Sequence, residues 1–163
     1  MNELAAKVIR TLAQRSINIA VAESLTGGLL GATLTTVPGS SKVFLGGVVS
    51  YATRLKTALL GVPFDSIAAH TVVSEEVAID MAVGLQNRTN ADWVIAVTGV
   101  AGPDPQEGHQ PGEVWICVLG PRIAALSQFR QVQHFQFEGD RDSVRQQTVD
   151  AALTMLLRLV SPV

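Results

Sequence analysis

The sequence of 163 residues has few charges, one cysteine and no long apolar run, and each scarcity excludes a class of protein. Charged residues make up only 16% of the chain and the net charge is −2, so no basic stripe exists for a nucleic-acid partner. No stretch approaches the ~20 apolar residues of a membrane span, so we expect no membrane partner. The N-terminal 16 residues lack the continuous apolar segment of a signal peptide, and a cytoplasmic protein is expected.

The cysteine and the histidines offer little chemistry of their own. Cys117 is the only cysteine, so no intramolecular disulfide is possible, and its apolar neighbours indicate a small buried residue. His70, His109 and His134 are far apart and lack the spacing of metal ligands, so we expect no metal site. No GxSxG motif surrounds any serine, although the sequence leaves a Ser-His-Asp triad open.

Apolar residues, in contrast, make up 47% of the chain, which is enough to bury one sizeable core. The length fits one domain better than two. Short apolar runs predict buried strands at residues 17–22, 43–51, 93–98 and 113–119. Three phenylalanines of equal parity in a polar stretch indicate a further, half-exposed strand: Phe129, Phe135 and Phe137.

Helices are predicted between these strands. The first runs to about residue 15, the second spans 29–37, and the third begins at the N-cap Thr53. A fourth follows the N-cap Ser74, and a fifth follows Asp140. The inner face of the last helix is expected to contain Val144, Thr148, Ala151, Met155 and Leu159. Because helices alternate with apolar strands, we predict an α/β fold, a three-layer α/β/α single domain over residues 1–163 with a mixed, mostly parallel central sheet.

The segment AESLTGG, residues 22–28, is the first candidate for chemistry. Ser24 follows a predicted buried strand, and α/β sheets usually place ligands at the carboxyl ends of their strands. Free backbone N–H groups at the start of the next helix would bind an anion or stabilise an oxyanion. The local sequence leaves open that Ser24 or Thr26 is only a helix N-cap. Glu23 either orients a catalytic group or pairs with a neighbour.

A lysine near a helix start is the second candidate. Tyr51 ends a predicted strand, and Lys56 falls in the first turn of the helix that Thr53 is expected to cap. The positive end of a helix dipole disfavours a cation, and partial burial would lower the lysine pKa further. A lysine with a pKa near neutrality is a usable general base. An ordinary exposed helix lysine is the alternative.

Arg141 and the segment TGVAGP, residues 98–103, complete the candidates. Arg141 would begin the last helix at its positive end, so a nearby anion is expected: a substrate phosphate, or the side chain of Asp142 or Glu138. TGVAGP follows a buried strand, and its glycines let a ligand approach the backbone. It matches neither phosphate-binding glycine motif, so a plain turn is the alternative. The loop of residues 99–113 is long for a compact domain, and such loops are often functional.

Five motifs occur in order along the chain: AESLTGG, YATRLKTALLGV, HTVVSEEVAIDMAVG, AVTGVAGPDPQEGHQPGEVW and FEGDRDSVR. Together they resemble the nicotinamide-nucleotide amidohydrolases of the PncC family, which are equivalent to the C-terminal domain of competence/damage-inducible protein CinA. The resemblance spans about residues 20–145. Because the chain starts just before this domain, it resembles the stand-alone form without the larger CinA N-terminal domain.

The resemblance implies hydrolysis of the carboxamide of nicotinamide mononucleotide to nicotinate mononucleotide and ammonia, in pyridine nucleotide salvage, without a metal or organic cofactor. It implies Ser24 as nucleophile and Lys56 as its base, with Tyr51 relaying or orienting the proton and the N–H groups of residues 26–28 holding the oxyanion. The positions that match the family's substrate site are Thr26, Gly27, Gly28, Thr98, Gly99, Gly102 and Arg141. We also expect a small-molecule nucleotide as partner and a homo-oligomer.

The sequence departs from the family pattern in two places. The family usually has AESCTGG, and here Leu25 replaces the cysteine, which excludes a cysteine nucleophile at this position and leaves the serine mechanism intact. Ala52 and Thr53 follow Tyr51 where Ser-Asn is common, and a lost polar contact there would alter affinity or substrate choice. Two other functions stay open: a non-catalytic nucleotide-binding module, or an amidase for a different small carboxamide.

Overall fold

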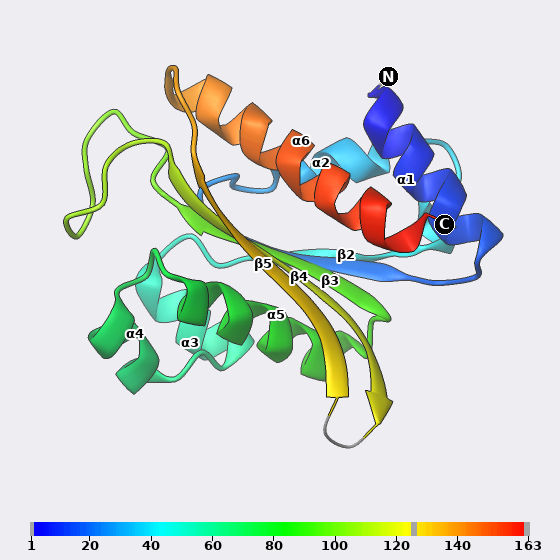
Figure 1. The fold of residues 1–163 in the computed structure, drawn as a ribbon, viewed down its shortest axis with the longest axis horizontal. Coiled ribbons are helices and arrows are strands. Elements are labelled where there is room, and N and C mark those ends of the chain that lie inside the picture. Colours follow the sequence, from blue (N-terminus) through cyan, green and yellow to red (C-terminus); the bar gives the residue numbers. More distant parts are fainter. Residues whose placement is uncertain (1, 125–126, 162–163) are drawn as a thin grey trace.

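A five-stranded mixed sheet forms the centre of the computed structural model, which describes residues 2–124 and 127–161 (Figure 1). The strand order is β2-β1-β3-β4-β5. The strands are β1 (Ile19–Glu23), β2 (Phe44–Val49), β3 (Trp93–Gly99), β4 (Glu113–Ala124) and β5 (Ser127–Gln136). β1 pairs in parallel with β2 and β3, whereas β4 is antiparallel to both of its neighbours. The predicted mixed sheet is confirmed, with β2, β1 and β3 as its parallel part.

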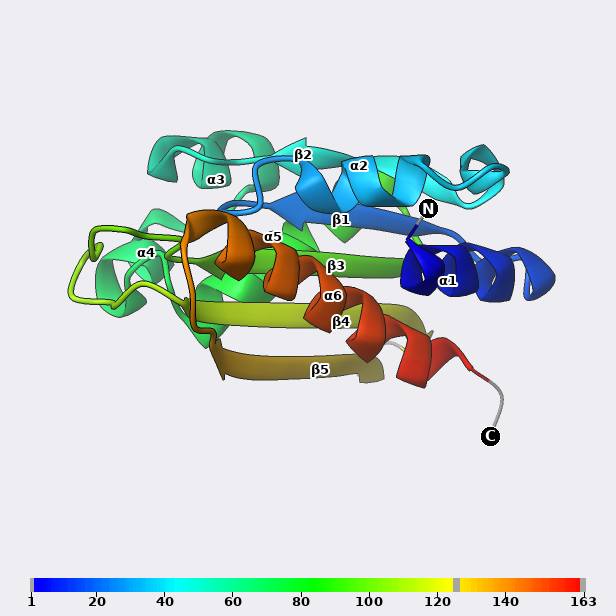
Figure 2. The ribbon, with the colours of Figure 1, turned by 90° about the horizontal axis from the view of Figure 1, so that it is seen from above.

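Helices cover both faces of the sheet (Figures 1 and 2). One face carries α1 (Glu3–Gln14), α2 (Leu29–Thr35) and α6 (Arg141–Val160). The other face carries α3 (Thr53–Leu60), α4 (Phe64–His70) and α5 (Glu75–Thr89). A short 3₁₀ helix, η1 (Ser40–Lys42), precedes β2. The three-layer α/β/α architecture that the alternation of helices and strands predicts is therefore confirmed. No helix within residues 2–124 and 127–161 is both long and apolar enough to cross a membrane.

Two apolar cores lie on opposite sides of the sheet because successive strand residues point to opposite faces. Toward α1, α2 and α6 the central strands present valine and isoleucine, whereas toward α5 they present mostly alanine at residues 20, 22 and 96. All five residues of β1 are buried, which explains why its first four residues, 19–22, form a continuous apolar run in the sequence. Cys117 is fully buried in the α5-side core, as predicted.

Several element boundaries differ from the prediction. Ala52, not Thr53, is the N-cap of α3, and no side chain caps this helix; Thr53 is its first helical residue. Helix α4 was not predicted, because none of its residues is buried and no apolar periodicity marks it. β4 continues beyond residue 119, and Phe137 lies just after the end of β5.

The buried face of α6 is broader than the predicted one. Val144, Thr148 and Met155 are buried as expected, but Ala151 and Leu159 are only partly buried. Five further positions of the helix are buried: Val149, Ala152, Leu153, Leu156 and Val160. The difference arises because α6 packs against both the sheet and α1, so a single four-residue repeat describes only part of its contact surface.

Gly84 in α5 sets how closely α3 approaches α5. A Cβ atom at residue 84 would lie 1.7 Å from the backbone oxygen of Leu60, the last residue of α3. Glycine to alanine within a helix normally stabilises by about 1 kcal/mol. We expect Gly84→Ala instead to lower the free energy of unfolding by about 1–3 kcal/mol in urea denaturation, because overpacking forces the helices apart. Increased stability of this variant would contradict the close α3–α5 contact.

Candidate active site

The carboxyl ends of the three parallel strands bring the predicted site residues to one edge of the sheet. Ser24 directly follows β1, Tyr51 follows β2 by two residues, and Thr98 and Gly99 end β3. Parallel strands run in the same direction, so their carboxyl ends share an edge, where α/β proteins commonly bind ligands. Because β1 pairs with both β2 and β3, Ser24 lies between the ends of the other two strands.

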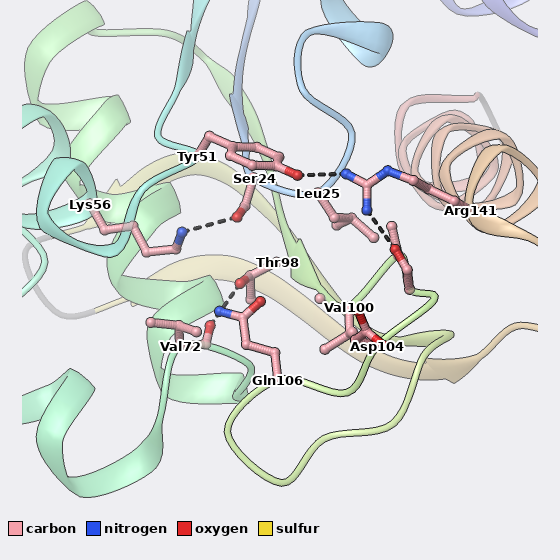
Figure 3. A pocket seen from close by; sticks show the side chains of 13 residues that line it. Ser24, Leu25, Tyr51, Lys56, Val72, Thr98, Val100, Asp104, Gln106 and Arg141 are labelled. Carbon is pink, nitrogen blue, oxygen red and sulfur yellow. Dashed lines mark hydrogen bonds between the residues drawn. The ribbon is translucent and has the colours of Figure 1, made fainter.

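A polar pocket of about 120 Å³ opens at this edge (Figure 3). Most of the predicted site residues line it: Ser24, Tyr51, Lys56, Thr98, Gly99, Gly102 and Arg141. The pocket is also lined by Val72, Asp104 and Gln106, which the sequence reasoning did not single out. The length of the loop after β3 was the one signal that pointed toward the last two residues.

Lys56 is bound to Ser24 inside the pocket. Its Nζ atom donates one hydrogen bond to Ser24 Oγ at 2.9 Å and another to the backbone oxygen of Ser50 at 2.8 Å (Figure 3). Only 1% of Lys56 is exposed, so its interpretation as an ordinary surface lysine is wrong. In the part of the chain that the structure describes, no carboxylate forms an ion pair with Lys56.

Burial lowers the pKa of Lys56 to about 8, well below its ordinary value of 10.5, because desolvation disfavours the charged amine. The charge of Glu107 acts in the opposite direction and raises this pKa, but burial dominates. Lys56 is the fourth residue of α3, whose first turn contains no acidic residue, so the helix dipole also disfavours the cation. Near neutral pH a usable fraction of the amine is therefore neutral and able to accept a proton.

Glu23 binds the start of α2 with its side chain. The carboxylate is 2% exposed and accepts hydrogen bonds from the backbone N–H groups of Gly28 at 3.0 Å, Leu30 at 3.0 Å and Gly31 at 2.8 Å. A carboxylate at this position satisfies the unpaired donors of the helix start and its positive end. Of the two roles that the sequence left open for Glu23, the structure shows the pairing with a neighbouring segment.

Thr26, Gly27 and Gly28 do not line the pocket, in contrast to the prediction. The Gly27 N–H donates to the backbone oxygen of Ser24 at 3.0 Å, and the Gly28 N–H is bound to the carboxylate described above. Thr26 is fully buried, and its backbone oxygen accepts a hydrogen bond from Arg145 at 2.9 Å. These groups shape the turn after Ser24, and the donors of Gly27 and Gly28 are not free to hold an oxyanion.

Other backbone donors are free beside Ser24. Leu25, Ala101 and Gly102 line the pocket, and within the described residues their N–H groups have no hydrogen-bond partner. Two of them belong to the glycine-containing loop after β3, and the third directly follows the serine. The Leu25 side chain is buried in the core formed with α1, α2 and α6, so the apolar residue at this departure from the family pattern is well accommodated.

Arg141 joins three segments at the mouth of the pocket. Its guanidinium donates to the backbone oxygen of Gly102 at 2.6 Å and to the hydroxyl of Tyr51 at 2.6 Å (Figure 3). Arg141 begins α6 after the N-cap Asp140, whose carboxylate accepts the Ser143 N–H at 2.9 Å, as expected. The Tyr51 hydroxyl is therefore held by arginine, not by the serine or lysine that it was expected to assist.

Neither acidic neighbour considered in the sequence pairs with Arg141. Asp142 forms its salt bridge with Arg145 at 3.1 Å, and Glu138 forms none with Arg141. Over residues 2–124 and 127–161, Arg141 thus has no carboxylate partner, and its charge is available to an anionic ligand. Within the same residues, no group of histidine, cysteine or acidic side chains is arranged to hold a metal ion.

The fold and the pocket define a class: a three-layer α/β domain with a buried serine–lysine pair at the carboxyl edge of its parallel strands. Residues 1–160 match the family model of the CinA C-terminal domain, and the chain belongs to this family. A CinA-like protein of Frankia casuarinae is 43% identical over 94% of this chain, and one of Synechococcus sp. (strain CC9902) is 46% identical over 97%. These matches cover 34% and 37% of the relatives, so the chain spans about a third of their length.

Solved structures agree with the family assignment. A competence-damaged protein (CinA) superfamily protein from Klebsiella pneumoniae 700603 superposes with a TM-score of 0.91 at 31% identity, over 97% of this chain and 96% of that one. The competence/damage inducible protein CihA from Agrobacterium tumefaciens gives a TM-score of 0.90 at 31% identity, over 98% and 94%.

The burial of Lys56 has a consequence for stability. Because its folded pKa is below the unfolded value, the unfolded chain binds more protons between pH 8 and 10.5, and stability should rise with pH across that window. We expect Lys56→Met to raise the free energy of unfolding at pH 7 by about 1–2 kcal/mol, since the relief of desolvation exceeds the two lost hydrogen bonds. Urea denaturation at several pH values measures the effect.

Lys42→Met is the matched control, because Lys42 is exposed and its replacement should leave the pH dependence of stability unchanged. The advantage of Lys56→Met should shrink as the pH rises from about 8, where the native lysine loses its charge. A Lys56→Met protein that is less stable than the wild type at every pH would show that the lysine is primarily a structural residue.

Proposed function

We propose that this protein is an amidase that hydrolyses the carboxamide of nicotinamide mononucleotide to nicotinate mononucleotide and ammonia. The observation that carries the proposal is the 2.9 Å hydrogen bond between Lys56 Nζ and Ser24 Oγ inside a polar pocket. A serine hydroxyl is a weak nucleophile unless a base removes its proton, and a buried lysine of lowered pKa is such a base. The substrate follows from the resemblance of the motifs to the PncC amidohydrolases.

The mechanism uses the atoms that face each other in the pocket. Neutral Lys56 accepts the Ser24 proton while Ser24 Oγ attacks the amide carbon. The free N–H groups of Leu25, Ala101 and Gly102 replace those of residues 26–28 as donors to the oxyanion. The resulting ammonium of Lys56 gives the proton to the amide nitrogen, the C–N bond breaks and ammonia leaves. Water, deprotonated by Lys56, then attacks the acyl-enzyme ester, which releases nicotinate mononucleotide and returns the proton to Ser24.

The size of the pocket divides the substrate between its interior and its mouth. The pocket, at about 120 Å³, is small for a ligand site, so we place only the ring with its carboxamide in its interior. The ribose phosphate therefore extends to the mouth, where Arg141 offers a guanidinium that has no carboxylate partner among the described residues, a group suited to phosphate. Tyr51, 55% exposed and bound to Arg141, contributes a ring beside the entering pyridinium in place of the expected proton relay.

Ammonia release from nicotinamide mononucleotide tests the serine–lysine pair. We expect Ser24→Ala and Lys56→Met each to lose on the order of 10²–10⁶-fold in rate, because catalytic groups that act as a unit depend on each member. The kcat/KM of the wild type should rise with pH up to about 8, where Lys56 becomes neutral. Lys42→Met serves as control and should retain full activity.

Three outcomes would contradict all or part of this assignment. A Ser24→Ala enzyme with unchanged turnover removes the serine as nucleophile. Calorimetric binding of the mononucleotide without any ammonia release by the wild type favours a non-catalytic nucleotide-binding module instead. Turnover of other small carboxamides in preference to the mononucleotide would keep the amidase chemistry and change the substrate.

The role of Arg141 is tested by comparing substrates with and without the phosphate. We expect Arg141→Gln to raise KM for nicotinamide mononucleotide about 10- to 100-fold, which corresponds to the loss of a charge-assisted hydrogen bond. The same substitution should change kcat/KM for nicotinamide riboside, which lacks the phosphate, by much less. Equal losses on both substrates would indicate that Arg141 only holds the loop through Gly102 and Tyr51.

A further inference from the structure

Two residues with strained backbones lie close to the pocket, on two segments that contact each other. Thr71, which follows α4, has φ 65°, and Glu107, in the loop after β3, has φ 48°. Positive φ is uncommon outside glycine, asparagine and aspartate, and for a β-branched threonine it is a genuine outlier. Each such residue costs on the order of 1–3 kcal/mol and persists only where its surroundings hold it.

Glu107 occupies the tip of a tight hairpin. Gln106 and His109 form an isolated antiparallel bridge, with backbone N–H to oxygen distances of 3.0 and 2.8 Å. The two residues between them, Glu107 and Gly108, both have positive φ, at 48° and 85°, which is the geometry of a type I′ turn. Asparagine or glycine is favoured at the first of these positions, so local turn preference does not explain a glutamate there.

The side chains of this tip reach the segment between α4 and α5. Glu107 Oε2 accepts the backbone N–H of Val72 at 3.1 Å, and His109 Nε2 lies 2.7 Å from Thr71 Oγ1. His109 Nδ1 lies 3.0 Å from a carboxylate oxygen of Glu113. Because a carboxylate only accepts, Nδ1 carries the proton in the neutral ring, and Nε2 accepts the threonine hydroxyl.

The chain Glu113–His109–Thr71 has the connectivity of a nucleophilic triad, but its surroundings do not fit that chemistry. Thr71 does not line the pocket. The N–H of Val72, the residue after the threonine, is bound to Glu107 and cannot serve as an oxyanion donor. The contacts therefore act as a two-point attachment between the loop tip and residues 71–72.

We propose that Glu107 is a positioning residue of the Ser24–Lys56 site: with His109 it clasps the loop tip to Thr71 and Val72, and so holds Val72 and Gln106 in place where they line the pocket. The inference rests on the proposed function only where it predicts changes in the rate of ammonia release. The clasp, meaning the contacts of Glu107 and His109 with residues 71–72, is a feature of the fold in its own right.

The clasp joins two segments that line the pocket. Val72 comes from the segment before α5, and its backbone oxygen accepts the Thr98 hydroxyl at 2.7 Å, whereas Gln106 and Asp104 come from the loop after β3. Figure 3 shows Val72, Thr98 and Gln106 on the same side of the pocket, opposite the ring of Tyr51. Release of the clasp would thus free Gln106 and Asp104 from the positions where they face a bound substrate.

The charge of Glu107 acts on the base of the site. It raises the pKa of Lys56 against the larger effect of burial. The other ionisable groups that line the pocket are Tyr51 beside β2, Arg141 at the start of α6 and Asp104 on the same loop as Glu107. Removing the charge of Glu107 should therefore lower the Lys56 pKa below about 8 and increase the neutral fraction at pH 7.

Two substitutions separate the charge from the clasp. Glu107→Gln removes the charge but retains an oxygen that can accept the Val72 N–H, whereas Glu107→Ala removes both. Glu3→Gln makes the same charge change in α1, on a different element from the pocket, and serves as the control. Since Lys7, Lys42 and Lys56 are the only lysines, an NMR titration of lysine side chains follows Lys56 directly, with Lys56→Met for assignment.

We expect the Lys56 titration to move to lower pH in both Glu107 variants and to stay unchanged in Glu3→Gln. Hydrogen exchange at the Val72 amide should accelerate about tenfold or more in Glu107→Ala, which removes the acceptor of this N–H, and should change much less in Glu107→Gln, which retains an acceptor. In ammonia release, the acid limb of kcat/KM should move to lower pH in both variants, and KM should rise about tenfold in Glu107→Ala alone.

Each part of the proposal has an outcome that overturns it. An unchanged Lys56 titration in Glu107→Gln overturns the action of its charge on Lys56. Unchanged exchange at the Val72 amide in Glu107→Ala overturns the clasp. Because neither measurement requires turnover, a wild-type protein that releases no ammonia but gives the expected titration and exchange contradicts only the proposed amidase function.

Discussion

A lysine buried without a carboxylate partner is the constraint on which the rest of the site depends. Removal of an amine from water disfavours its charge, and within residues 2–124 and 127–161 Lys56 has only the Ser24 hydroxyl and one backbone oxygen as hydrogen-bond partners. Two features of the fold place Lys56 beside Ser24 in spite of the free-energy cost of its burial. Its helix, α3, packs closely on α5 through Gly84, and β1 ends directly before Ser24. A nearby acid in direct contact would stabilise the ammonium, raise the pKa of the lysine and leave little of the neutral amine that serine activation requires.

In two helices near the pocket, α2 and α6, a carboxylate accepts one or more of the free N–H groups at the helix start. At α2 the buried carboxylate of Glu23 takes up the free N–H groups, so this helix start belongs to the scaffold of the turn after Ser24. At α6 the carboxylate of Asp140 caps the helix, and Arg141 points to the pocket mouth without an acidic partner among the described residues. The anion-binding group of the site is therefore a side chain from the end of the sequence, not the helix that follows the serine.

Two residues with strained backbones lie where the loop after β3 meets the segment before α5. Thr71 and Glu107 both have positive φ, and each contributes to a contact that joins the two segments. Leu25, where the sequence departs from the family pattern, differs from these two residues. It is buried in an apolar core and does not have a positive φ. The apolar core thus accommodates the departure at Leu25, whereas the side of the pocket that contains Val72 depends on specific polar contacts.

The sequence by itself determined the alternation of helices and strands, the buried apolar strands and the short list of site residues. These features depend on the periodicity of apolar residues and on chain order, which are local properties of the sequence. It also placed Ser24, Tyr51 and Thr98 near strand ends, and hence at one edge. Only the tertiary structure decided that Lys56, 32 residues from Ser24, is its hydrogen-bond partner, and that Arg141 binds Tyr51 across 90 residues. It also decided that Glu23 occupies the α2 start and that Glu107 reaches Val72. Such contacts depend on how packed elements approach each other in space, and no local pattern encodes that distance.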